Sequence, residues 1–252
     1  MLSAEYRDPV LFLTLNRPEV RNAFNDELIG ALTDAFTRLP KGARAVVLTG
    51  EGVAFCAGGD LEWLRKAAGY SQTENVADAL RLAQLFGTIQ TCPAVVIARV
   101  NGAAFGGGCG LVAAADVAVA STEAKFAFSE VRLGLIPATI APFVLAKIGA
   151  GHARALFTTG EAFDAARALQ IGLVHALVSP TELDAAVDAK LQAVLAAGPS
   201  ATVLARELAL EEITGPDETA RRLAAARASD EGREGVAAFL EKRKPNWVRP
   251  WP

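Results

Sequence analysis

Short runs of β-prone apolar residues alternate with segments of helical periodicity, and this alternation constrains the fold more than any other feature of the chain. Residues 10–15 and 45–49 form two such runs, and each ends at residues that favour a turn. Between them, apolar residues recur at helical spacing over residues 26–39, behind Asn25 or Asp26 as the N-cap. Strand, helix and strand in this order predict an α/β fold.

The alternation continues through the middle of the chain. We predict a helix over residues 75–90, a strand over 94–98, a helix over 109–115 and a strand over 117–120. The whole stretch from 93 to 120 is apolar enough to raise the question of a membrane span, but charged residues, an asparagine and several glycines interrupt it. We therefore interpret it as the buried core of an α/β protein and expect no membrane association.

The C-terminal part of the chain has a different composition. From about Pro180 the residues are mostly Ala, Leu, Glu and Arg, with breaks only at residues 198–199 and 215–216. This pattern is typical of helices alone. We predict two parts, a core of residues 1–195 and a helical region of residues 196–252.

Charge and cysteine usage exclude several classes of protein. The chain has 25 Lys and Arg against 28 Asp and Glu, a net charge of −3, so it has no general field that attracts nucleic acid. The basic residues 242–244, with Trp247 and Trp251 nearby, are better interpreted as a solvated tail or a subunit contact than as a nucleic-acid patch. Three cysteines without a CxxC pair, and a polar N-terminus without a secretory signal, predict a cytoplasmic protein.

Histidine chemistry is not supported by the sequence. The chain has only His152 and His175, and neither lies beside a nucleophile or a set of metal ligands in the sequence. Catalysis by a Ser/His/Asp triad and a histidine-rich metal site are both disfavoured. We expect no metal.

Two glycine-rich turns are the strongest candidates for a site. Residues 55–61 and 105–110 each lead from an apolar run into a helix-like segment. Glycine lets a ligand approach the backbone, and the free N–H groups of a helix N-terminus favour negative charge. A tight turn without function is the alternative for each. Two converging N–H donors would form an oxyanion hole, which binds the enolate of a thioester more strongly than its ground state.

Glu130 is the candidate acid or base. If residues 126–132 are extended, alternation places Phe126, Phe128 and Glu130 on one face. A carboxylate among phenylalanines loses solvent, which raises its pKa toward the range useful for proton transfer. A surface ion pair between Glu130 and Arg132 is the alternative.

Several segments resemble, in order and nearly from end to end, the enoyl-CoA hydratase/isomerase (crotonase) superfamily. The matching segments are residues 15–24, 55–61, 100–108, 128–137 and 239–245. The resemblance implies an α/β fold, a crotonase-type spiral of repeated ββα units with a C-terminal helical oligomerisation region. It also implies a homotrimer or a dimer of trimers.

The resemblance further implies the roles of individual residues. The backbone N–H groups of Ala57 and Gly107 would hold the thioester oxygen while Glu130 transfers the proton. The positions that would line the substrate and its CoA moiety are Arg21, Ala23, Gly58, Gly59, Asp60, Leu61, Gly106, Gly110, Phe239 and Lys242. Phe239 and Lys242 would reach the CoA of a neighbouring subunit. CoA would be part of the substrate, and no separate cofactor is implied.

The sequence departs from the family pattern at Gly110, where typical enoyl-CoA hydratases have a second glutamate. A pair of glutamates divides the handling of one water molecule. A single base is enough to move a proton from Cα to Cγ, as in Δ3,Δ2-enoyl-CoA isomerases. Hydration by one carboxylate, which holds the water and returns its proton on the same face, stays open.

Finer features resemble the bacterial 3-methylglutaconyl-CoA hydratases of leucine degradation and the related glutaconyl-CoA hydratases of terpenoid breakdown. These features lie at residues 108–112, 129–142 and 161–165. We therefore expect reversible hydration of 3-methylglutaconyl-CoA to 3-hydroxy-3-methylglutaryl-CoA. The alternatives are an isomerase or general short-chain hydratase and, from another class, an RNA-binding or non-catalytic protein of the same fold.

A substrate of this kind ends in a carboxylate, which a cation should meet. The candidates by proximity to the motifs are Arg65, Lys66, Arg99, Arg132 and Lys147. The sequence does not choose among them.

Overall fold

The structure is a computed structural model that describes residues 1–211, 215–249 and 251. The strands are β1 (Leu2–Arg7), β2 (Val10–Leu15), β3 (Ala45–Gly50), β4 (Ala54–Cys56), β5 (Val95–Val100), β6 (Ala103–Phe105), β7 (Val117–Ser121), β8 (Lys125–Ala127), β9 (Ala162–Asp164) and β10 (Ala176–Val178). The helices are α1 (Asp26–Thr37), α2 (Leu61–Ala67), α3 (Gln72–Gln90), α4 (Gly107–Ala114), α5 (Ala141–Thr159), α6 (Ala165–Gln170), α7 (Leu183–Ala196), α8 (Pro199–Leu210), α9 (Pro216–Ala228) and α10 (Asp230–Leu240). Three 3₁₀ turns, η1 (Pro18–Val20), η2 (Ser129–Leu133) and η3 (Pro180–Glu182), complete the described elements.

The strands form two sheets that the chain visits in turn. The larger sheet has the order β1-β2-β3-β5-β7-β10, parallel from β2 onward, and the smaller has the order β4-β6-β8-β9. Each of β3, β5 and β7 enters the large sheet, is followed by a short strand of the small sheet, and then by helix. This repeat is the predicted spiral of ββα units, and the α/β fold class is confirmed.

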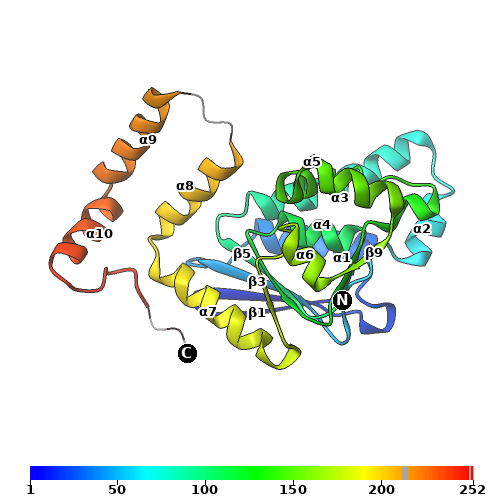
Figure 1. Ribbon diagram of the computed structural model, residues 1–252, viewed down its shortest axis with the longest axis horizontal. Coiled ribbons are helices and arrows are strands. Elements are labelled where there is room, and N and C mark those ends of the chain that lie inside the picture. The colour runs from blue at the N-terminus through cyan, green and yellow to red at the C-terminus, as the bar shows by residue number, and fades with distance from the viewer. Residues whose placement is uncertain (212–214, 250, 252) are drawn as a thin grey trace.

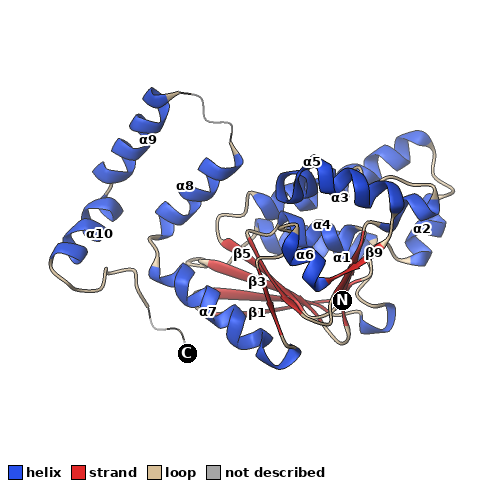
Figure 2. Cartoon of the chain, viewed as in Figure 1, coloured by secondary structure: helices blue, strands red, loops and turns tan. Residues whose placement is uncertain are grey.

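The large sheet is covered by helices on both faces. Helices α1, α3 and α4 pack on one face and α7 on the other (Figure 2). The buried side chains of β5 alternate between these faces, with Val96, Ala98 and Val100 in the larger core and Val95 and Ile97 in the smaller. The prediction that the apolar stretch from 93 to 120 is buried core is therefore confirmed.

The predicted helix ends differ by a few residues where capping decides them. Asn25 caps α1 and accepts a hydrogen bond from the Leu28 N–H, as one of the two predicted caps. Helix α3 begins at Gln72 rather than at residue 75, because Ser71 and Glu74 form a capping box. Helix α4 begins at Gly107, two residues earlier than predicted.

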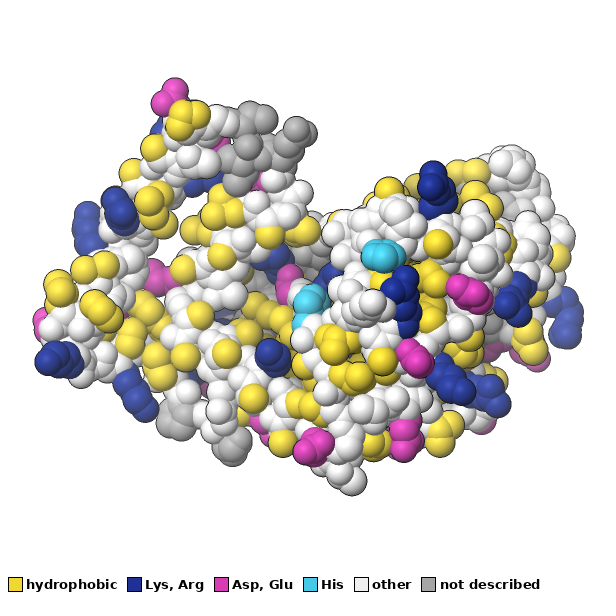
Figure 3. Space-filling model, in the orientation of Figure 1, with side chains coloured by type: hydrophobic (Ala, Val, Ile, Leu, Met, Phe, Trp, Pro, Cys, Tyr) yellow, Lys and Arg dark blue, Asp and Glu magenta, His cyan; other side chains and the backbone are white. Residues whose placement is uncertain are grey.

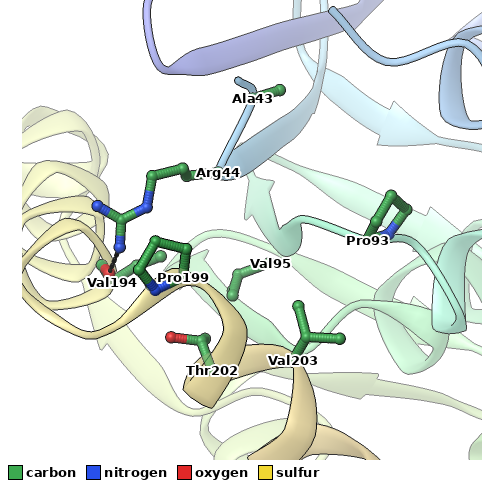
Figure 4. A pocket seen from close by; sticks show the side chains of 8 residues that line it. All are labelled: Ala43, Arg44, Pro93, Val95, Val194, Pro199, Thr202 and Val203. Carbon is green, nitrogen blue, oxygen red and sulfur yellow. Dashed lines mark hydrogen bonds between the residues drawn. The ribbon is translucent and has the colours of Figure 1, made fainter. Parts of the chain in front are cut away.

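Helices α7 to α10 follow with no strand among the described residues between them, and the helix-only prediction is confirmed for that described part. Helix α7 packs on the sheet, and Arg44 donates a hydrogen bond to the Val194 carbonyl at the C-terminal end of this helix (Figure 4). Arg44 also donates to the Leu195 carbonyl. The boundary between residues 195 and 196 falls at this end of α7 and stays a prediction. At the end of the chain, the Trp251 ring stacks on Phe12, with 6.1 Å between centroids.

Helices α8, α9 and α10 extend away from the rest of the chain, on the left of Figure 1. Hydrophobic side chains gather along them on the face shown in Figure 3. The exposed ones are Leu204, Leu208, Leu210, Leu223, Val236, Phe239 and Leu240. Among the described residues, no single helix is long and apolar enough to span a membrane. The segment of η3 and α7 reaches that length and apolarity only together with α8, and the two parts of this pair are bent by 106°.

Candidate active site

Three functional segments follow three neighbouring strands of the small sheet. The glycine-rich turn at residues 57–60 follows β4, the turn at Gly106 follows β6, and Glu130 follows β8. These strands are parallel, so their carboxyl ends meet at one edge of the sheet. The topology therefore brings together segments that are up to about 70 residues apart in the sequence.

The first turn contradicts the sequence-based choice of donor. The Ala57 N–H donates a hydrogen bond to the Arg21 carbonyl at 3.0 Å, so it is occupied within the protein. The Gly58 N–H donates to the sulfur of Cys56; burial raises the pKa of this thiol to about 12, and the hydrogen bond from Gly58 acts in the opposite direction. The Gly59 N–H makes no hydrogen bond with any described residue. Gly59 therefore replaces Ala57 as the candidate donor.

The direction of the Gly59 N–H follows from the peptide group that contains it. The carbonyl of Gly58, in the same peptide, accepts a hydrogen bond from the Phe24 N–H at 2.7 Å. The C=O and N–H of a trans peptide point in opposite directions. The Gly59 N–H therefore points away from Phe24 and toward open space, since Gly59 is exposed.

The second turn places Gly107 at the first position of α4. The Gly106 N–H donates to the Ala127 carbonyl, and the Gly106 carbonyl accepts from the Gly110 N–H. The Gly107 N–H makes no hydrogen bond with a described residue and lies at the helix N-terminus, where negative charge is favoured. Gly106 has a φ of 50°, which residues with side chains rarely adopt, and a Cβ there would lie 3.2 Å from Glu130 Oε1, so a side chain at this position would be strained.

Glu130 lies on η2 and not on an extended strand. Strand β8 ends at Ala127, and the chain then turns into the 3₁₀ helix, so the predicted alternation beyond Ala127 is wrong. The predicted loss of solvent around Glu130 is nevertheless found, because Phe126 and Phe128 are buried and Glu130 is half-buried. Its Oε2 is buried without a partner among the described residues. Desolvation raises the pKa of Glu130, and its own backbone N–H offsets part of that rise.

The departure at Gly110 has a structural counterpart. A Cβ at Gly110 would lie 2.4 Å from Ile140 Cγ2 and 2.8 Å from the Phe86 ring. Both side chains are fully buried. The place of a second glutamate is therefore filled by hydrocarbon, and Gly110, which is itself buried, offers no surface to a substrate.

We expect Gly110→Ala to lower the free energy of unfolding by about 1–3 kcal/mol, because the added methyl overpacks the wall formed by Ile140 and Phe86. Denaturant titration measures the effect. Gly30→Ala is the matched control, since Gly30 lies in α1 with nothing within 4 Å of its added Cβ. It should stabilise the protein by up to about 1 kcal/mol. A Gly110→Ala variant as stable as the native protein would mean that Ile140 and Phe86 can move to accommodate a side chain at this position.

The remaining predicted substrate-binding residues divide into three groups. Arg21 and Leu61 are exposed next to the first turn, which suits contact with a ligand. Ala23 and Asp60 are buried; Arg17 donates to the backbone carbonyl of Ala23 and to the carboxylate of Asp60, so neither side chain is open to a ligand. Phe239 belongs to the last turn of α10 and Lys242 follows that helix. In Figure 1, α10 lies on the opposite side of the molecule from α2, so one chain does not bring this segment to the site.

Two of the five candidate cations lie away from the site. Arg99 projects from the face of β5 that α7 covers and forms an ion pair with Asp184 at 2.7 Å. Lys147 donates to the Ala115 carbonyl at the C-terminal end of α4, the end opposite Gly107. Both choices from sequence proximity are therefore wrong.

The other three candidate cations lie on elements that adjoin the site. Lys66 pairs with Asp26 at 3.1 Å, and Arg132 Nε donates to the Gly160 carbonyl. Arg65, on α2, is exposed and forms no ion pair with a described residue. These three stay candidates.

Neither histidine lies in a setting that suggests catalysis. His175 Nδ1 accepts a hydrogen bond from the Ala118 N–H, and burial lowers its pKa to about 4. His152 is exposed beside Arg167. Among the described residues, no three His, Cys, Asp or Glu side chains are grouped as metal ligands.

Comparison with known proteins identifies the class of protein. The family model described as enoyl-CoA hydratase/isomerase matches residues 5–250. A crotonyl-CoA hydratase from Syntrophomonas wolfei is 32% identical over 253 residues, 97% of this chain and 96% of its own. The chain belongs to the enoyl-CoA hydratase/isomerase family. The predictions of the superfamily and of an enoyl-CoA hydratase-type enzyme acting on an acyl-CoA thioester are confirmed at this level.

Solved structures agree with this assignment. The enoyl-CoA hydratase from Shewanella pealeana has 37% identity and a TM-score of 0.91, with 98% of this chain and 95% of that chain covered. AtuE from Pseudomonas aeruginosa has 36% identity and a TM-score of 0.92, with coverage of 98% and 99%. The crotonase fold extends over almost the whole chain.

Proposed function

We propose that this protein hydrates 3-methylglutaconyl-CoA reversibly to 3-hydroxy-3-methylglutaryl-CoA, with Glu130 as its one acid and base. The observation that carries the proposal is the single half-buried carboxylate of Glu130, which faces the Gly106 turn with one oxygen unpartnered among the described residues. The specific substrate rests on the finer sequence resemblance at residues 108–112, 129–142 and 161–165.

In the proposed reaction, Glu130 accepts a proton from water, and the water oxygen bonds to C3 of the substrate. The π electrons of the double bond move through C2 to the thioester oxygen, which becomes an enolate oxygen. The N–H groups of Gly59 and Gly107 donate to that oxygen. The proton then passes from Glu130 to C2 on the same face, and the thioester carbonyl re-forms. Each atom of the water ends in the product, and Glu130 returns to its ionised state.

The raised pKa of Glu130 supports this role. A carboxyl that holds a proton more strongly than usual is a better base toward water and still releases the proton to the enolate. The hydrocarbon wall of Phe86 and Ile140 supports a mechanism that needs no second carboxylate.

The same wall favours a second candidate. A single base can remove a proton from C2 of a 3-enoyl-CoA and return it to C4, which is the Δ3,Δ2-enoyl-CoA isomerase reaction. This reaction requires no water, and Gly110 with its filled surroundings is compatible with it.

The deciding experiment compares kcat/KM for 3-methylglutaconyl-CoA, crotonyl-CoA and a 3-enoyl-CoA. We expect the first to be preferred by at least about tenfold, as an ion pair to its distal carboxylate would provide. Replacing Arg65, Lys66 and Arg132 singly by Gln should identify the cation: one variant raises KM for the diacid and leaves KM for crotonyl-CoA unchanged. A preference for the 3-enoyl substrate would contradict hydration and favour the isomerase.

We propose further that the protein assembles as a homotrimer or a dimer of trimers through α8 to α10. The exposed apolar side chains of these helices support this, because they need a partner to leave water, and a second copy offers the same surface. We expect Phe239→Glu together with Leu240→Glu to yield monomers by light scattering. Leu61→Glu, on an exposed leucine outside this region, is the control for adding charge. A double variant that keeps the mass of the native protein would contradict this assembly.

A further inference from the structure

Arg17 is a half-buried cation behind the first turn that the proposed mechanism does not use. Its side chain is 15% exposed and pairs with Asp60, which is 8% exposed, at 2.8 Å. Its other terminal nitrogen donates to the Ala23 carbonyl at 2.6 Å. Arg17 thus bonds both to the loop at residues 21–24 and to the turn that contains Gly59.

From Arg17, a continuous series of hydrogen bonds leads to the candidate donor. The Ala23 carbonyl, which Arg17 holds, belongs to the same peptide as the Phe24 N–H. That N–H donates to the Gly58 carbonyl at 2.7 Å, and this carbonyl belongs to the same peptide as the Gly59 N–H. Two peptide groups therefore lie in series between a guanidinium ion and the Gly59 N–H, with their dipoles aligned.

Such a series has two physical effects. Hydrogen bonds in a chain polarise one another, so the positive charge at one end strengthens the N–H donor at the other. The bonds also fix the planes of both peptides, which sets the direction of the Gly59 N–H. The Asp60 side chain holds Arg17 and caps α2 through the Glu62 N–H at 2.8 Å, while the Asp60 N–H donates to the Phe24 carbonyl.

The loop depends on these bonds. Arg21 and Asn22 have φ values of 54° and 58°, a region that residues with side chains rarely adopt. The buried Asn22 side chain accepts from the Arg17 N–H and donates to the carbonyls of Glu51 and Ala54. The pKa of Asp60, which burial alone would raise, is lowered overall by the bonds from Glu62 and Arg17, so Asp60 stays ionised beside Arg17.

We propose that Arg17, held by Asp60, is a positioning residue for the thioester oxygen, acting through the peptides 23–24 and 58–59 on the Gly59 N–H. This inference rests on the proposed function, because it assigns the Gly59 N–H to the thioester oxygen. Arg17 does not touch the substrate. Its removal should weaken the stabilisation of the enolate more than the binding of the CoA moiety.

The test measures polarisation of the carbonyl directly. A 4-(dimethylamino)cinnamoyl-CoA thioester absorbs at longer wavelength when donors polarise its carbonyl. We expect the native protein to produce this red shift, Arg17→Met to lose at least half of it, and Arg17→Lys to lie between the two. Steady-state kinetics should show kcat lowered about tenfold in Arg17→Met, less than for loss of a donor, with KM within about threefold.

Arg206→Met is the matched control. Arg206 is a half-buried arginine too, with a side chain 12% exposed. It pairs with Asp116 at 3.6 Å and donates to the Ala94 carbonyl, but it lies outside the site. It should lower Tm about as much as Arg17→Met and leave the red shift unchanged. If Arg17→Met does not fold, Asp60→Asn provides the test, because it keeps the shape of the cap and removes the charge that holds Arg17.

The outcomes separate the two proposals. If Arg17→Met keeps the full red shift and the native kcat, the role of Arg17 is overturned, while turnover of enoyl-CoA by the native protein still supports the proposed function. The same result in Asp60→Asn has the same meaning if that variant replaces Arg17→Met. A loss of red shift in Arg206→Met equal to that in Arg17→Met would also overturn the role of Arg17, since any buried ion pair would then do the same. A native protein that produces the red shift, loses it in Arg17→Met and turns over no enoyl-CoA would contradict the proposed function and support the inference about Arg17.

Discussion

Glu130→Gln should lower kcat by about 1,000-fold with little change in KM, because the variant keeps the shape of the side chain and loses the base. The expectation follows from the position of Glu130 beside the Gly106 turn, with Oε1 facing that turn. Initial rates with 3-methylglutaconyl-CoA and with crotonyl-CoA measure it. Glu130→Asp is the control. It keeps a carboxylate on a side chain one methylene shorter, so it should retain more activity than Glu130→Gln.

The pH dependence should follow from the direction of the pKa shift. Burial raises the pKa of Glu130, and the reaction needs its ionised form, so kcat/KM should fall on the acid side at a pH above the ordinary value of about 4.3 for a glutamate. An acid limb at or below the ordinary value, or a Glu130→Gln variant with more than a tenth of native kcat, would remove Glu130 from the mechanism.

Stability should depend on pH with a definite sign. A carboxyl whose pKa is raised by folding binds its proton more tightly in the folded state, so its ionisation destabilises the fold as pH rises. The penalty is absent below the unfolded-state pKa and complete above the folded-state pKa. The stability of Glu130→Gln relative to the native protein should therefore increase through this interval, which denaturant titrations at several pH values would detect.

The parts of the fold that periodicity encodes were predictable from the sequence. The long strands β2, β3 and β5 and helix α1 each contain enough residues for alternation or helical spacing to show, and the breaks before Pro199 and Pro216 mark helix starts. The strands of the small sheet were not predictable in this way. β4, β6 and β8 are three residues long, too short for a pattern, and are defined by pairing with one another.

The wrong predictions at the site also arise where contacts between distant parts of the chain, and not a local pattern, determine the structure. Alternation predicts an extended segment that continues beyond Ala127 to Glu130, whereas the chain turns into η2 there. The motif indicates Ala57 as a donor, but whether its N–H is free depends on the Arg21 carbonyl, which is 36 residues away in the sequence. Arg17 was visible only as part of a motif, because its bonds to Ala23 and Asp60 exist only in the folded chain. For Gly59, the one indication in the sequence is that it belongs to the glycine-rich turn at residues 55–61.

Gly59→Pro should lower kcat by about 100-fold to 1,000-fold, because proline has no N–H to donate to the thioester oxygen. The side chain itself should be tolerated. A Cβ at Gly59 would lie 3.4 Å from the side chains of Leu64 and Trp63, and the φ of Gly59 is outside the left-handed region. Gly59→Ala therefore serves as the matched control, since it adds the Cβ, keeps the N–H, and should stay within about threefold of the native kcat.

A measurement without any substitution distinguishes Gly59 from Ala57 as the donor. When an acyl-CoA with an enolate-like thioester, such as acetoacetyl-CoA, binds, the amide proton that donates to its oxygen should move downfield in the nitrogen–proton NMR spectrum. We expect this for Gly59 and Gly107, whose N–H groups have no partner among the described residues, and not for Ala57, which donates to Arg21. A downfield shift of Ala57 with no change at Gly59 would mean that the Arg21 carbonyl releases its partner on binding. The donor would then be the residue that the motif indicated.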